Sequence, residues 1–83
     1  MFAEAVIQVD QAMNLVIIKS LPGMAQGCAS ALDSMRLQEV AGSIAGDDTI
    51  FIAARTVDQA ETLSSTLNQI AIQGASRKNR PRE

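Results

Sequence analysis

Two adjacent aspartates, Asp47 and Asp48, stand in the stretch SIAGDDTIFIA, directly before an apolar run. Neighbouring side chains of an extended chain point to opposite faces, so the pair is not expected to chelate one Ca²⁺ or Mg²⁺ ion. Two cationic partners, or one on each side of an interface, fit this geometry better. A planar guanidinium matches a buried carboxylate best, because it donates two parallel hydrogen bonds. The alternative is a hairpin turn whose acids keep its tip soluble.

A second pair of polar residues, Gln26 and Asp33, is separated by seven positions in MAQGCASALDSM. Seven helical residues make nearly two turns, so the amide and the carboxylate share one face. Asp33 also falls in the last turns of the expected helix, where the helix dipole opposes an acid by about 0.3 to 1 kcal/mol. A solvated aspartate is the commoner interpretation of such a residue, and a ligand contact is the second option.

The composition argues against the common kinds of catalytic and metal-binding chemistry. The chain has no His and a single Cys28, which excludes an internal disulfide, the usual zinc sites and His-dependent acid–base catalysis. Cys28 lies on the apolar face of its expected helix and is interpreted as a small core residue. No nucleophile–base pair, phosphate loop or metal cluster accompanies the acids. We therefore expect neither an enzyme nor a metal site or cofactor.

The size and charge of the chain limit the kinds of partner that it is expected to bind. With 83 residues the chain fits one small domain, for which oligomerisation is the expected source of extra stability. Four of the seven basic residues lie in the last seven positions, and residues 1–76 hold three basic and eight acidic residues, a net charge of −5. This negative charge disfavours binding to the phosphate backbone of nucleic acids and favours binding of a cationic ligand. No membrane span or signal peptide is predicted, so a cytoplasmic location is expected.

The elements that must position these residues follow from the periodicity. Two β-rich segments, Ala3 to Asp10 and Asn14 to Ser20, are separated by a break around Gln11 and predict a hairpin. Pro22 and Gly23 end the second strand, and a helix from about Gly23 to Met35 follows, with Met24, Cys28, Ala31 and Met35 at helical spacing. Two further strands, in EVAGSIAG and DTIFIAA, are hinged at Gly46, Asp47 and Asp48.

A last helix is predicted in TVDQAETLSSTLNQIAIQ, with Thr56 as its N-cap. Its expected buried stripe comprises Val57, Ala60, Leu63, Leu67, Ile70 and Ala71. Gly74 is expected to end this helix and to begin a basic, disordered tail over residues 74–83. The predicted fold class is α+β, a two-layer sandwich of order β-β-α-β-β-α, with an antiparallel sheet and two helices on one face over residues 1–73.

The segments LPGMAQGCASALDSM and VAGSIAGDDTIFIAAR, in this order and spacing, resemble the C-terminal domain of the bacterial arginine repressor family. The similarity covers the body from about Ala3 to Ile72. The family pattern is a Pro-Gly-x-Ala-Gln helix start, a Leu-Asp near that helix's end, and Gly-Thr-Ile-Ala-Gly-Asp-Asp-Thr-Ile at the hairpin. This sequence has Ser43 where the family usually has Thr. The change keeps the hydroxyl and removes a methyl group.

The resemblance implies trimers that pair into hexamers. It also implies that L-arginine, as a corepressor, is held between the two trimers of each hexamer. Carried over by position, Gln26 and Asp33 would contact the amino-acid end of arginine, and Asp47 and Asp48 its charged groups from two sides of the interface. Nearby contacts would come from Ala25, Ser43 and Ala45.

In the family, a winged helix-turn-helix domain precedes this region, and this sequence does not contain it. Operator DNA of arginine biosynthesis and catabolism genes is therefore expected to be bound only through that domain. The alternative function is a purely structural oligomerisation module without a ligand.

Overall fold

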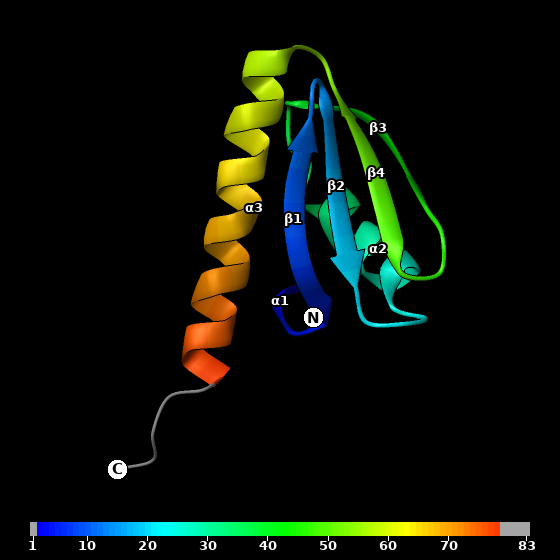
Figure 1. Ribbon diagram of the computed structural model, residues 1–83, viewed down its shortest axis with the longest axis vertical. Helices are drawn as coiled ribbons and strands as arrows, with labels where there is room; N and C mark the ends of the chain where they lie inside the picture. The colour runs from blue at the N-terminus through cyan, green and yellow to red at the C-terminus, as the bar shows by residue number, and fades with distance from the viewer. Residues whose placement is uncertain (1, 79–83) are drawn as a thin grey trace.

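In the computed structural model, residues 2–78 are described, with their side chains from residue 2 to residue 72. Seven elements follow one another along this part of the chain (Figure 1): α1 (Phe2–Ala5), β1 (Val6–Ala12), β2 (Leu15–Ser20), α2 (Ala25–Met35), β3 (Val40–Ala45), β4 (Thr49–Ala54) and α3 (Val57–Lys78). The strands form one antiparallel sheet of order β1-β2-β4-β3. The predicted α+β sandwich is confirmed, with one short helix added before the first strand.

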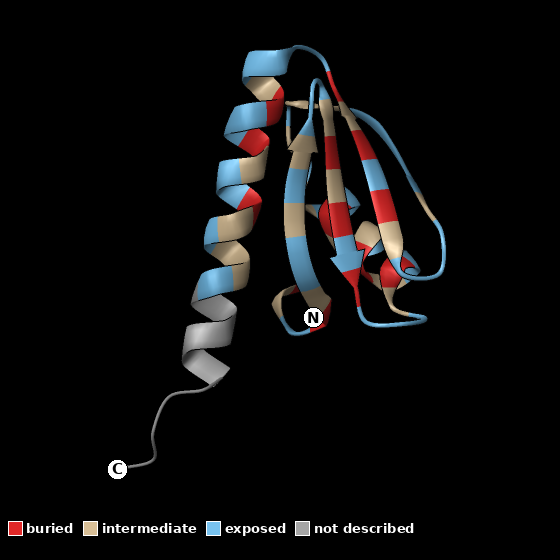
Figure 2. Ribbon diagram, viewed as in Figure 1, coloured by how far each residue is buried: buried red, intermediate tan, exposed pale blue. Residues whose placement is uncertain are grey.

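The core lies between one face of the sheet and the helices. Val16, Ile18, Ile50 and Ile52 are fully buried and pair across β2 and β4, Val16 with Ile52 and Ile18 with Ile50. Figure 2 shows the resulting alternation of buried and more exposed positions along both strands. The helices contribute a further buried set to the same core: Ala25, Cys28 and Leu32 from α2, and Ala60, Leu63 and Leu67 from α3. Burial on this scale is what stabilises a chain of this size.

The N-terminal segment differs from the prediction. Residues Phe2–Ala5 form a helical turn rather than the start of a strand, and β1 begins only at Val6. Phe2 and Ala5 are buried, and the carbonyl of Ala5 accepts a hydrogen bond from the backbone N–H of Leu21 at 2.8 Å. Packing against α2 and α3 therefore overrides the β propensity of this segment.

The first hairpin turn also lies elsewhere. β1 continues through Gln11 and Ala12, which pair with Val16 and Leu15, so the predicted break around Gln11 is wrong. The chain turns instead at Met13 and Asn14, with Met13 in the left-handed region at φ 57°. Asn14 anchors this turn, because its side-chain amide and its carbonyl both bond to the backbone of Ala54.

The helix ends confirm some expectations and correct others. Thr56 caps α3 as predicted, accepting the backbone N–H of Gln59 at 3.0 Å. Val57 is 51 % exposed and does not belong to the buried stripe. The backbone continues helically through Gly74 to Lys78, so the predicted stop at Gly74 is wrong. One glycine costs about 1 kcal/mol in a helix and does not end it by itself. Residues 79–83 of the expected tail lie outside the described residues.

The helix α2 begins at Ala25, two residues later than expected. Gly23 occupies a left-handed turn at φ 77°, a conformation that favours glycine, before the helix starts. Ala25, Cys28 and Leu32 form the buried stripe, whereas Met24, Ala31 and Met35 pack at its edge. This orientation turns Gln26 and Asp33 away from the core, as predicted.

Candidate functional site

The turn between β3 and β4 is held by its backbone. Asp47 accepts two hydrogen bonds through its carbonyl, from the N–H groups of Gly23 at 3.1 Å and Ala25 at 3.2 Å. The carbonyl of Asp48 accepts the N–H of Ser20 at 2.8 Å. These bonds fix the turn against the segment that leads into α2. The backbone of both aspartates is thereby ordered, while their side chains are exposed.

The two carboxylates have different surroundings. Asp48 accepts a hydrogen bond at Oδ1 from the Thr49 hydroxyl at 3.0 Å, and Lys19 Nζ donates to the same hydroxyl at 3.0 Å. In the part of the chain that the structure describes, no hydrogen bond reaches the Asp47 carboxylate. Each acid is therefore free to take a cationic partner, and neither is buried within a single chain.

Gln26 joins this turn from the first turn of α2. Its side-chain Nε2 donates a hydrogen bond of 3.2 Å to the carbonyl of Ala45, the last residue of β3. Ala25 is fully buried, and its N–H is already donated to Asp47. The structure thus brings five of the seven predicted residues together at one end of the sheet: Ala25, Gln26, Ala45, Asp47 and Asp48.

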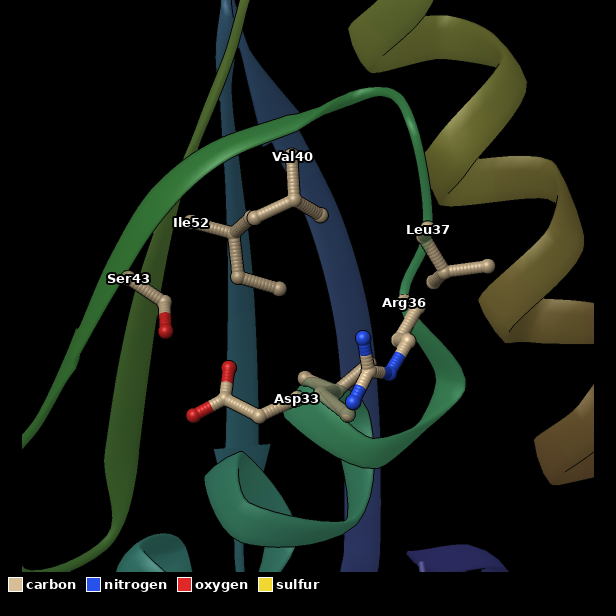
Figure 3. Close-up of a pocket in the computed structure, with 7 residues that line it drawn as sticks. Asp33, Arg36, Leu37, Val40, Ser43 and Ile52 are labelled. Carbon is tan, nitrogen blue, oxygen red and sulfur yellow. The ribbon is translucent and has the colours of Figure 1, made fainter.

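The remaining two, Asp33 and Ser43, meet at a small cavity of about 100 Å³. Figure 3 shows the carboxylate of Asp33 and the hydroxyl of Ser43 pointing toward each other, from the last turn of α2 and from the middle of β3. Ser43 pairs with Ile52 and so faces the helix side of the sheet. Both side chains are exposed at this cavity, which lies about 10 Å along α2 from Gln26 at the helical rise of 1.5 Å per residue.

Sequence reasoning missed Arg36, which lines the same cavity. Arg36 caps the C-terminus of α2 in the left-handed conformation, with φ 53° and ψ 51°. A basic residue where the helix pattern fades, with no glycine to end the helix, was the available signal. Sequence reasoning also missed the contact between Lys19 and Thr49. The alternation along β2 predicts this contact once the buried face of that strand is known.

Cys28 is confirmed as a core residue. It is fully buried in α2, and burial raises the pKa of its thiol, which disfavours the nucleophilic thiolate. Within residues 2–78, no group of three or more Cys, Asp or Glu residues is placed to hold a metal ion. The helices in that range include none that is long and apolar enough to cross a membrane.

Comparison with known proteins identifies the family of this chain. Residues 2–69 match the sequence profile of the family described as "Arginine repressor, C-terminal domain". A curated protein named arginine repressor from Caldicellulosiruptor saccharolyticus is 51 % identical over 73 residues, covering 88 % of this chain and 48 % of the relative. The arginine repressor of Carboxydothermus hydrogenoformans is 56 % identical over 59 residues, covering 71 % of this chain and 39 % of the relative.

A third relative, the arginine repressor of Acetivibrio thermocellus, is 44 % identical over 70 residues, covering 84 % of this chain and 46 % of the relative. The chain therefore belongs to the arginine repressor C-terminal domain family, as the resemblance of its two motifs indicated. This family is one of transcription regulators rather than enzymes. The chain spans about half the length of the curated relatives that it matches.

Proposed function

We propose that this domain binds L-arginine and self-associates, as the sensing part of a transcriptional regulator of arginine biosynthesis and catabolism. One observation carries the proposal. In a member of this family, the exposed carboxylates of Asp47 and Asp48 stand on a turn whose backbone is held by hydrogen bonds to Ser20, Gly23 and Ala25. Preorganised carboxylates bind a guanidinium with little loss of conformational freedom.

The electrostatics of the body support a cationic ligand. Residues 1–76 carry a net charge of −5, and two of the eight acids are adjacent on this turn. Their mutual repulsion is relieved when a cation binds, which favours the ligand-bound state. In this proposal Gln26 and Asp33 contact the amino-acid end of arginine. Asp47 and Asp48 bind its charged groups from two sides of a subunit interface, with Ala25, Ser43 and Ala45 supplying the nearby contacts.

The uncovered face of the sheet supports self-association. Phe51 pairs with Ile17 on one side and with Ile44 on the other, so the three form an apolar row across β2, β4 and β3. Ile44 is 72 % exposed and Phe51 46 % exposed. The row lines a shallow depression of about 630 Å³ together with Lys19 and Thr49. Contiguous exposed apolar surface of this kind marks an interaction site, and a second copy of the chain is the proposed occupant.

The assembly that we propose is a trimer that pairs into a hexamer, with L-arginine between the two trimers. Arginine acts as a corepressor, and we propose no other cofactor. Operator DNA is bound in the cytoplasm through a winged helix-turn-helix domain, and not through residues 1–83. A purely structural oligomerisation module is the second candidate, favoured by the same apolar row, and it differs by predicting no effect of arginine on assembly.

The direct test is calorimetry of the purified chain with L-arginine, L-lysine and L-citrulline. We expect arginine to bind more tightly than citrulline, which replaces the guanidinium with a neutral group. The Asp48 carboxylate, exposed in the single chain, is buried against the guanidinium at the proposed subunit interface. Asp48→Asn should therefore weaken arginine binding, because truncating one partner of a buried charged pair costs about 2 to 5 kcal/mol.

The matched control is Asp58→Asn, which removes an exposed acid in the first turn of α3, at the opposite end of the sheet from the β3–β4 turn (Figure 1). Asp58→Asn should leave arginine affinity unchanged. Equal affinities for citrulline and arginine would contradict the guanidinium assignment. Unchanged affinity in Asp48→Asn would remove Asp48 from the site.

A further inference from the structure

The cavity at the end of α2 brings together opposite charges. Asp33 and Arg36 both line it, and Ser43 adds a hydroxyl from β3. The remaining walls are apolar: Leu32, Leu37, Val40 and Ile52. In Figure 3 the guanidinium of Arg36 lies on the side of this residue that faces Asp33. One carboxylate and one guanidinium in a cavity of about 100 Å³ suit a small group that carries both charges itself.

Asp33 and Arg36 are not joined through their charged groups. Among the described residues, no ion pair or hydrogen bond joins the Asp33 carboxylate to the Arg36 guanidinium. The contact between the two residues is between their backbones, with the N–H of Arg36 donated to the carbonyl of Asp33 at 3.2 Å. Both charged groups therefore remain available to a ligand.

The backbone of Arg36 adopts a conformation that is unfavourable for a residue with a side chain. Its φ of 53° places it in the left-handed region, where residues other than glycine are disfavoured and where glycine is the usual helix C-terminal residue. A glycine here would end α2 with less strain. An arginine held in this conformation at the wall of a cavity indicates a use for the guanidinium.

We propose that Arg36 determines the specificity of this site for an α-amino acid, by pairing with the ligand's α-carboxylate while Asp33 accepts its α-ammonium. The Ser43 hydroxyl faces the same cavity and completes the polar lining. The ligand's side chain then extends along α2 toward the turn that carries Asp47 and Asp48. This inference rests on the proposed binding of arginine and adds the group that distinguishes an amino acid from a simple guanidinium compound.

The experiment compares L-arginine with agmatine, which keeps the guanidinium and the amine and lacks the carboxylate. Isothermal titration of the unmodified chain should show at least a tenfold preference for arginine, equivalent to about 1.4 kcal/mol. In Arg36→Gly the preference should fall toward one, chiefly through loss of arginine affinity. Arg36→Lys, which keeps the charge without the planar guanidinium, should retain an intermediate preference.

Met13→Gly is the matched control, because Met13 is the other described non-glycine residue with positive φ and is 76 % exposed in the β1–β2 turn. Both glycine variants relieve a left-handed backbone, so neither should lower the thermal midpoint. Met13→Gly should keep the full preference for arginine.

The outcomes separate this inference from the proposed function. If the unmodified chain binds arginine and Arg36→Gly keeps the same preference over agmatine, the role of Arg36 is wrong and the arginine site stands. Equal affinity of the unmodified chain for arginine and agmatine also overturns it. If the unmodified chain binds neither compound, the proposed function fails and this inference fails with it.

Discussion

On the covered face of the sheet, Val16, Ile18, Ile50 and Ile52 are fully buried beneath the helices, whereas on the open face Ile44 is 72 % exposed and Phe51 46 % exposed. The residues belong to the same strands or to their neighbours and are of similar size and polarity. What separates them is the layer of helices, whose buried residues join Val16, Ile18, Ile50 and Ile52 in one core. Similar side chains thus stabilise the fold on one face and remain available for association on the other.

The candidate site lies next to the open face of the sheet. The polar residues of the candidate site lie at the rim of the sheet, in the β3–β4 turn and along the side of α2 next to β3. Lys19 and Thr49 connect the rim to the open face, since they lie beside the apolar row and bond toward Asp48. A subunit covering the open face would therefore come close to the carboxylates that we assign to arginine.

The largest expected effect compares the same substitution on the two faces. Ile50→Ala removes a fully buried side chain and should lower the free energy of unfolding by about 2 to 5 kcal/mol. Ile44→Ala removes an exposed side chain and should change it by less than about 1 kcal/mol in the dissociated chain. Urea unfolding at low subunit concentration measures both. Similar losses would show that the open face is not free in the single subunit.

A smaller effect follows from Cys28, which packs in α2 over the covered face. Burial raises the pKa of this thiol in the folded state. Its contribution to stability is therefore fully present below the ordinary thiol pKa of about 8.5 and is lost as the pH rises through the folded value. Urea midpoints at pH 7.5 and pH 9.5 test this, because the unmodified chain should lose more stability than Cys28→Ala. An identical pH dependence of the two proteins would contradict it.

Local patterns predicted the parts of the fold that depend on local chemistry. Alternation in TIFIAA and the Gly-Asp-Asp sequence located β4 and its turn, and helical spacing placed Gln26 and Asp33 on one exposed face. The helical turn of Phe2–Ala5 could not be predicted this way. Four residues carry no period, and burial of Phe2 against distant helices determines their conformation.

The candidate site shows the same division. The acids and Gln26 were identifiable from residue type and spacing, whereas Ala25, Ser43 and Ala45 entered only through the resemblance to the family. Arg36 depends on a left-handed backbone at a helix end, which no periodicity reports. Which face of the sheet stays open could not be predicted either, because the strand LVIIKS is apolar on both sides.

The most direct test of the account is sedimentation velocity of the chain near its dissociation concentration, with and without L-arginine. A ligand held between subunits must shift assembly by mass action. We predict that arginine moves the distribution to the larger assembly, that citrulline does so far less, and that Ile44→Lys abolishes the shift by placing a charge on the open face. Identical distributions with and without arginine would contradict the proposed coupling and favour the purely structural module.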